Sequence, residues 1–223
     1  MALGSDGALY GTTSIGGAHG GGTVFKVNRV GTLKTIYDFC SEPNCTDGES
    51  PWAGLFLGSD ASFYGTTISG GASNTGTIFR VTSAGQLTTL HSFCDPDCSG
   101  GSYPYGGLLQ ATNGIFYGTT YAGTPGGDCY YLGCGTIYSL DTGLGPFVTF
   151  VRPAGKSGQT GGILGQGFTG TTSVAINGIQ THFAVVSDTY IKATVPPGAT
   201  TGYVTVTTPT GVLTSNVPLR VIH

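Results

Sequence analysis

Apolar and polar residues roughly alternate along short runs of the chain, and turn-forming pairs such as Asp6-Gly7 and Asn113-Gly114 separate these runs. Each run is rich in β-branched and aromatic residues, which fit a pleated, half-buried surface. Alternation with a period of two places one set of side chains on each face of a strand. The pattern therefore predicts short β-strands joined by tight turns along the whole chain.

The same strand-like blocks return three times in the same order. A Tyr-Gly-Thr-Thr block occurs at residues 10–13, 64–67 and 117–120. Two further blocks follow it in each copy, at residues 22–27 and 33–39, 76–81 and 87–93, and 135–140 and, degenerately, 147–150. Another strand is expected before the Tyr-Gly-Thr-Thr block, so that a complete unit of about 53 residues has four antiparallel strands, which is typical of a β-propeller blade.

From Gly155 the repeat period ends and the sequence becomes rich in Thr, Val and Gly. Six or seven short strands are expected here, at residues 161–164, 173–176, 182–186, 190–195, 203–207 and 217–222. The pair Asn177-Gly178 is typical of a two-residue hairpin turn. About 70 residues in this pattern, without a Cys-Trp-Cys core, predict a small β-sandwich of the immunoglobulin kind.

Both regions resemble known families. Residues 3–13, which read Leu-Gly-Ser-Asp-Gly-Ala-Leu-Tyr-Gly-Thr-Thr, and the block at 22–27 resemble the GloVer tandem repeat of bacterial "choice-of-anchor" surface proteins, a likeness that extends to about residue 151. Residues 165–178, 186–196 and 202–207 resemble the IPT/TIG domain. The first resemblance implies a secreted or surface-displayed propeller-like array, and the second implies an immunoglobulin-like module used for spacing, display or interaction.

Taken together, the patterns and the resemblances predict an all-β chain with two domains. The first, residues 1–151, is a partial β-propeller-like array of three four-stranded repeats, at about 1–45, 46–98 and 99–151. The second, residues 152–223, is a C-terminal immunoglobulin-like (IPT/TIG) β-sandwich.

Three blades are fewer than the four to eight or so that close a propeller. We therefore expect the chain to be part of a longer protein, or two copies to pair, and the isolated chain to self-associate through its open blade edges. The first residues have no charged segment followed by an apolar one, so the export signal is expected outside this chain.

Composition narrows the class of protein. With 41 Gly, 11 Pro and only 9% charged residues the chain suits strands and turns, and 12 Tyr and 11 Phe supply apolar area for a core. The net charge is −3 and the 8 Lys and Arg residues are scattered, which argues against nucleic acid as a partner. No apolar run is long enough for a membrane span, and no pattern calls for a cofactor.

The cysteines fall into three close pairs, Cys40 with Cys45, Cys94 with Cys98 and Cys129 with Cys134. An even number in local pairs indicates disulfides and therefore an extracytoplasmic location. The first two pairs directly follow Phe39 and Phe93 in successive repeats, as staples on equivalent loops would. A zinc site is the alternative, although zinc usually takes closer Cys-x-x-Cys pairs that converge.

An aromatic residue follows proline at the entry to each complete repeat. These residues are Trp52 and Tyr105, and Tyr103 lies just before the second proline. If exposed, the three would form a platform on which sugar rings stack; packing beneath the loop is the alternative. Asp95 and Asp97 in the second cysteine loop are candidate calcium ligands, because calcium takes clustered oxygen atoms from loops.

No catalytic residues are expected. Glu42 and Glu49, the only glutamates, lie near Asp47 in a spacing that a glycosidase would allow, but the equivalent loop of the second copy has no glutamate. The glycine-rich run at residues 16–22 precedes no helix, so it is not a phosphate-binding loop.

The sequence thus predicts a non-catalytic, secreted or cell-surface repeat protein that acts in binding, adhesion or surface architecture, with a surface glycan or a protein as partner. The alternative is a carbohydrate-active enzyme, or its accessory carbohydrate-binding region, whose catalytic residues lie on blades outside these residues.

Overall fold

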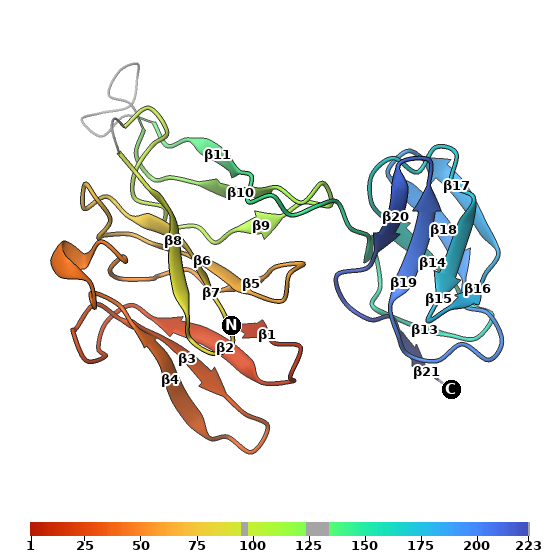
Figure 1. Cartoon of the computed structure of the whole chain (residues 1–223), viewed down its shortest axis with the longest axis horizontal. Helices are drawn as coiled ribbons and strands as arrows, with labels where there is room; N and C mark the ends of the chain where they lie inside the picture. Colours follow the sequence, from red (N-terminus) through yellow and green to blue (C-terminus); the bar gives the residue numbers. More distant parts are fainter. Residues whose placement is uncertain (95–97, 124–133, 223) are drawn as a thin grey trace. The chain divides into compact units, whose positions relative to one another are not determined.

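The computed structural model describes residues 1–94, 98–123 and 134–222, and the chain forms two compact units (Figure 1). The first comprises Met1–Gln110 and Phe116–Leu140, and the second comprises Ala111–Ile115 and Asp141–His223. The described residues contain one short 3₁₀ helix, Pro43–Cys45, and no α-helix. The described strands pair mostly antiparallel into several sheets, none of them closed, and this confirms the prediction of an all-β repeat protein. No helix in the described part of the chain is long and apolar enough to cross a membrane.

The first unit has one antiparallel sheet for each repeat. The first sheet is β1-β2-β3-β4, formed by Ala2–Leu3, Leu9–Thr13, Thr23–Val27 and Leu33–Asp38. The second is β5-β6-β7-β8, formed by Phe56–Leu57, Phe63–Thr67, Thr77–Val81 and Leu87–Ser92. The third is β11-β10-β9, formed by Ile137–Leu140, Phe116–Thr119 and Leu109–Gln110.

The strand register is the same in the first two repeats. Tyr10 pairs with Lys26 across β2 and β3, and Tyr64 pairs with Arg80 across β6 and β7. A register shift occurs at the equivalent point of β3 and β7, between Val24 and Phe25 in the first case. The sequence repeat is therefore also a structural repeat.

The third repeat differs from the prediction in its last strand. The segment at residues 147–150, aligned by sequence with the fourth strand of the earlier repeats, contains β12 (Thr149–Phe150), and β12 pairs with β14 (Thr160–Leu164) of the second unit. The prediction of a fourth strand in this repeat was therefore wrong. Val148 lies fully buried in the core of the second unit, so burial decides the partner of a segment whose alternation indicates only that it is a strand.

Successive repeats are joined by stacked aromatic rings. Tyr10 of β2 stacks on Phe63 of β6 with ring centroids 4.0 Å apart. Tyr64, the equivalent of Tyr10, lies on Phe116 of β10 with centroids 4.2 Å apart. All four side chains are almost completely buried, and rings of this size supply a large share of the buried apolar area. One contact is thus used twice along the first unit.

A second ring contact accompanies each stack. Phe39, which follows β4, meets Phe79 edge to face at 5.0 Å, and Phe93, which follows β8, meets Tyr138 in the same way at 5.1 Å. Burial raises the pKa of Tyr138. The residue that precedes each cysteine loop is therefore part of the core between repeats.

A polar cluster closes the turn before the Tyr-Gly-Thr-Thr strand in the first and second repeats. The Tyr10 hydroxyl donates to Asp6 at 2.9 Å, and Lys26 forms an ion pair with the same carboxylate at 2.6 Å. The hydrogen bond from Lys26 lowers the pKa of Asp6 to about 2. Asp60 makes the equivalent contacts with Tyr64 and Arg80, at 3.1 and 2.9 Å.

The second unit is a sandwich of two four-stranded sheets. One has the order β12-β14-β18-β17 and the other β16-β15-β19-β20, with a parallel pair β13-β21 beside them. The remaining strands are β13 (Ala154–Lys156), β15 (Ser173–Ile176), β16 (Ile179–Gln180), β17 (Phe183–Ser187), β18 (Tyr190–Thr194), β19 (Val204–Thr208), β20 (Gly211–Thr214) and β21 (Arg220–Ile222). Buried residues of both sheets, such as Ile163 and Val204, belong to one core cluster.

All six strands expected in this unit are present, β15 with the expected ends and the other five with ends shifted by one to three residues, whereas β13, β16 and β20 were not predicted. Asn177 and Gly178 both have positive φ, 46° and 81°, and join β15 to β16 as the expected two-residue turn.

The glycine of the Tyr-Gly-Thr-Thr motif lies beneath an aromatic ring in each repeat. A Cβ atom on Gly65 would lie 2.5 Å from the Phe79 ring and 3.0 Å from Leu55. Gly65→Ala should therefore lower the free energy of unfolding of the first unit by about 1–3 kcal/mol through overpacking, as measured by urea denaturation. Gly100→Ala is the control, because its Cβ would meet no atom within 4 Å. Equal losses for the two variants would contradict this account of the motif.

Candidate functional site

The loops that enter the second and third repeats are each anchored to the preceding repeat through proline. A Cβ atom on Gly22 would lie 2.8 Å from Pro51, and one on Gly76 would lie 2.7 Å from Pro104, so each proline packs closely against a glycine. Both glycines have positive φ, 94° and 102°, a conformation that glycine adopts without strain. The proline therefore docks at the same place in both repeats.

A threonine of the preceding repeat holds the other side of the loop. Thr12 Oγ1 donates to the carbonyl of Ala53 at 2.9 Å, and Thr66 Oγ1 donates to the carbonyl of Gly106 at 3.0 Å. The aromatic residue of each loop, Trp52 or Tyr105, lies between the anchored proline and the anchored carbonyl. Its backbone is thus fixed before any ligand is present.

Three aromatic side chains come together on the surface next to these loops, and we call them the aromatic cluster. They are Trp52, Tyr105 and Tyr121, with 64%, 47% and 63% of their surface exposed. The ring centroids of Trp52 and Tyr105 are 6.1 Å apart and those of Tyr105 and Tyr121 are 5.6 Å apart, both at 73°. Exposed apolar surface of this extent on a folded protein often marks an interaction site.

Tyr103, the third aromatic residue proposed from sequence, has a different position. It is half-buried, has a positive φ of 56°, and among the described residues makes no ring contact with the cluster. Its carbonyl accepts hydrogen bonds from the backbone N–H groups of Tyr105 and Tyr121, at 3.0 and 2.9 Å. Tyr103 therefore positions two members of the cluster through its backbone.

Tyr121 was missed by the sequence reasoning. It directly follows the third Tyr-Gly-Thr-Thr block, where the earlier repeats carry Ser14 and Ile68. The replacement of a small or aliphatic residue by an aromatic one at a repeated position was the available signal.

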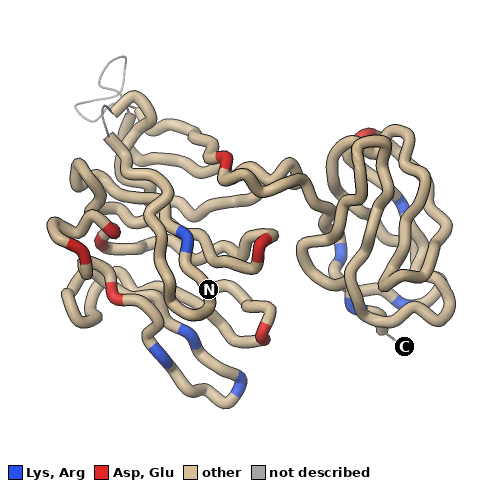
Figure 2. The backbone as a smooth tube through the Cα atoms, in the orientation of Figure 1, with Lys and Arg blue, Asp and Glu red and all other residues tan. Residues whose placement is uncertain are grey.

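Charged residues are sparse in each unit (Figure 2), and three of the four Lys and Arg residues of the first unit, Lys26, Arg29 and Lys34, lie on the β3–β4 hairpin. The loops that carry the aromatic cluster contain no Lys or Arg, so the cluster suits a neutral partner better than a polyanion.

The cysteine loops are closed by disulfides. Cys40 is bonded to Cys45 and Cys94 to Cys98. Cys40 and Cys94, at equivalent positions, share positive φ values of 64° and 56°. Cys129 of the third predicted pair and the candidate calcium ligands Asp95 and Asp97 lie outside the described residues.

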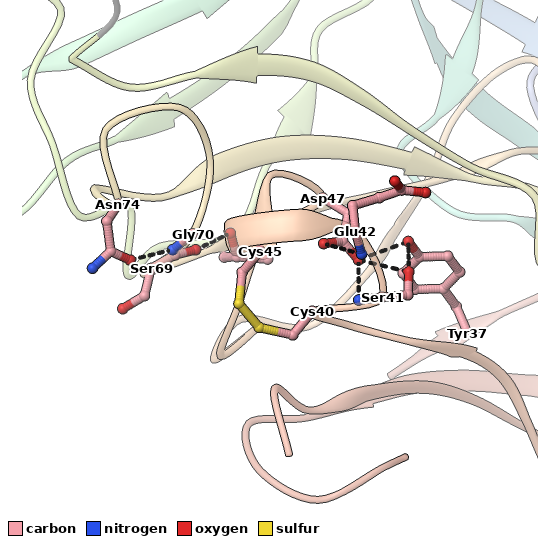
Figure 3. Close-up of a disulfide and its surroundings, with 10 residues drawn as sticks. Tyr37, Cys40, Ser41, Glu42, Cys45, Asp47, Ser69, Gly70 and Asn74 are labelled. Carbon is pink, nitrogen blue, oxygen red and sulfur yellow. Dashed lines mark hydrogen bonds between the residues drawn. A yellow bond between two sulfur atoms is a disulfide. The ribbon is translucent and has the colours of Figure 1, made fainter. Parts of the chain in front are cut away.

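The first cysteine loop has its own hydrogen-bonded centre (Figure 3). Buried Asp47 accepts hydrogen bonds from the Tyr37 hydroxyl at 2.8 Å and from the Ser41 N–H at 3.0 Å, and burial raises the pKa of Tyr37 to about 12. The Cys45 carbonyl accepts the Gly71 N–H of the next repeat at 2.9 Å. Asp47 thus orders the loop, and the Cys45 carbonyl holds the loop beside the next repeat.

The sulfur atoms of Cys40 and Cys45 and a carboxylate oxygen of Glu49 lie within 4.8 Å of one another. If the two cysteines were reduced, these three groups would be available to a metal ion such as zinc. The alternative to the first disulfide is therefore a defined three-residue site.

Stacked antiparallel sheets with repeated ring contacts define the protein as a β-repeat protein. The chain belongs to the Gloeobacter/Verrucomicrobia repeat family, whose model matches residues 1–182. This match confirms the repeat family predicted from the sequence. No curated protein matches the chain.

Two solved structures show limited similarity. A putative phosphatase from Bacteroides thetaiotaomicron VPI-5482 is 26% identical over 33% of this chain and 17% of its own, with a TM-score of 0.30. Gamma-CGTASE from alkalophilic Bacillus clarkii is 17% identical over 72% of this chain and 24% of its own, with a TM-score of 0.33. The chain thus spans only a small part of either protein, and these likenesses carry no functional argument.

Disulfides and a zinc site at the cysteine loops would give different results in peptide mapping. Unreduced protein should yield Cys40 joined to Cys45 and Cys94 joined to Cys98, with no stoichiometric zinc. Replacing both Cys40 and Cys45 with serine should lower the free energy of unfolding by about 2 kcal/mol, because a short closed loop is lost from the unfolded chain. Free thiols together with bound zinc in the purified protein would contradict the disulfides.

Proposed function

We propose that this protein is an extracytoplasmic, non-catalytic binding protein, and that its aromatic cluster binds a neutral glycan. The observation that carries the proposal is the exposure of Trp52, Tyr105 and Tyr121 side by side, on loops anchored before binding. The repeat family and the all-β fold agree with a binding role.

The chemistry of the cluster suits sugar rings. A pyranose has an apolar face of C–H groups and a rim of hydroxyl groups, and an aromatic ring offers an apolar face with, in tyrosine, a hydroxyl at one end. Rings inclined at 73° form corners in which one sugar contacts two side chains. Because the loop backbones are fixed, little conformational entropy is lost when the ligand binds.

The other parts of the proposal rest on the fold. The repeats are blades of a propeller-like array, supported by their equivalent sheets and ring contacts, and the second unit is an IPT/TIG domain that spaces or displays them, supported by its sandwich of two sheets. The two disulfides support an oxidising, extracytoplasmic location. The same cluster would also serve the accessory binding region of a carbohydrate-active enzyme.

Trp52 is the only tryptophan, so its fluorescence reports on the cluster directly. Titration with neutral hexasaccharides of the cello-, malto- and xylo- series should shift this emission for at least one of them. By calorimetry, Trp52→Ala and Tyr105→Ala should each weaken that glycan about tenfold or more, as expected for residues at the centre of a binding surface.

Tyr203→Ala is the matched control, because Tyr203 is an exposed tyrosine of the second unit. It should leave glycan affinity unchanged. Absence of any shift across a broad glycan panel, or an equal loss in Tyr203→Ala, would overturn the glycan proposal.

We also propose that copies of the chain associate through the outer faces of the repeat array. Ile137 is 82% exposed, although its equivalents Val24 and Ile78 are 0% and 1% exposed because the next repeat covers them. On the opposite face Leu9 is 41% exposed, while its equivalent Phe63 is stacked on Tyr10. The two faces have the same pattern as the surfaces that pack together inside the chain, so each is suited to the other.

The molar mass measured by sedimentation should therefore rise with protein concentration. Ile137→Lys should weaken this association about tenfold or more, because it places a charge on an apolar interface. Val212→Lys, at an exposed position of β20, adds the same charge elsewhere and should have no effect. A constant monomer mass at all concentrations would refute association through these faces.

A further inference from the structure

The second unit contains a partly open pocket of about 180 Å³ beside its first strands, β12, β13 and β14. β12 pairs with β14 only as far as Phe150, the Val151 N–H then donates to the Gly162 carbonyl, and β13 pairs with β21 instead. The chain therefore leaves the edge of β14 beside Gly161 and Gly162, and the pocket lies where it departs. Its apolar wall is formed by side chains from both sheets, Phe150, Ile163, Ile176, Val195, Val204 and Leu219.

Gly161 explains why this space is not filled. In β14 it lies on the same face as buried Ile163, two residues away, and it pairs with Ala193 of β18. A Cβ atom on Gly161 would meet no atom within 4 Å, and its φ lies outside the left-handed region, so neither space nor backbone conformation requires glycine here. A residue without a side chain thus leaves open a position that faces the core.

Two cations line the same pocket. Arg152 and Lys192 are both exposed, and in the described part of the chain neither makes an ion pair, since both ion pairs found there are in the first unit. Lys192 pairs with Gly162, so its side chain lies on the face of the sheet opposite Gly161 and Ile163, and Arg152 is the cation that follows the point where the chain leaves β14. The second unit carries four basic residues, Arg152, Lys156, Lys192 and Arg220, and two acidic ones, Asp141 and Asp188. Asp188 already accepts the backbone N–H groups of Gly167 and Thr169. The charge around the pocket therefore favours an anion.

We propose that this pocket binds a small amphiphilic anion, an aryl or short alkyl carboxylate. Its apolar part lies against Phe150, Ile163 and Leu219, and its carboxylate lies toward Arg152. An engineered apolar cavity of about 150 Å³ in another protein holds benzene, so a pocket of about 180 Å³ admits one aromatic ring. This site is separate from the aromatic cluster and belongs to the other unit.

The test uses the full chain with phenylacetate and its uncharged counterpart phenylacetamide, followed by amide chemical shifts in NMR titrations. Phenylacetate should give saturable shifts around β14 and β18. Gly161→Val fills the open position with a strand-forming side chain and should abolish these shifts while the rest of the spectrum stays unchanged. Gly145→Val is the control, because its Cβ also meets no atom within 4 Å and it lies outside the pocket; it should bind normally.

The charged end is tested separately. Arg152→Gln should weaken phenylacetate about two- to fivefold, the range of an exposed ion pair, and leave phenylacetamide unchanged. Absence of saturable shifts with phenylacetate in the native protein, or full binding by Gly161→Val, would overturn the proposal. Equal loss of both probes in Arg152→Gln would overturn the assignment of the carboxylate to this cation. Because glycan binding is measured at Trp52 in the other unit, none of these results depends on it.

Discussion

The stacking of a tyrosine on a phenylalanine of the next repeat is the interaction on which the first unit depends. Each stack buries two rings between sheets whose described strands share no backbone hydrogen-bond ladder, so ring packing joins the sheets and single hydrogen bonds, such as that from the Gly71 N–H to the Cys45 carbonyl, join their loops. Neighbouring residues are suited to this contact. Gly65 leaves room for the Phe79 ring of the adjacent strand, and Asp6 accepts a hydrogen bond from the Tyr10 hydroxyl at the edge of the core. The motif around the tyrosine is therefore a packing motif.

Most of the repeat structure could be predicted from the sequence, because the information is local. Strand alternation, turn residues such as Asn177-Gly178 and the recurrence of whole blocks are read from neighbouring residues, and they gave correct strands in both units. The pairing of β12 with β14 could not be read in this way. Its segment has the alternation of a strand, but the burial of Val148 depends on residues far along the chain.

The aromatic cluster was predicted only in part for the same reason. Proline followed by an aromatic residue identified Trp52 and Tyr105, and sequence alone left open whether the rings are exposed or buried beneath the loop. Tyr121 comes from a different strand end, so only the folded chain brings it to Tyr105. Tyr103 shows the converse case, since an aromatic residue next to the motif is half-buried and acts through its carbonyl.

The anchoring of the entry loops does not depend on the side chains that these loops expose. Proline and a main-chain carbonyl fix each loop, and neither depends on the side chain between them, which is tryptophan in one loop and tyrosine in the next. The side chain at this position can therefore be substituted while the backbone of the loop stays in place. Substitutions at successive entry loops would alter the exposed surface at a regular spacing and leave the core between the repeats unchanged.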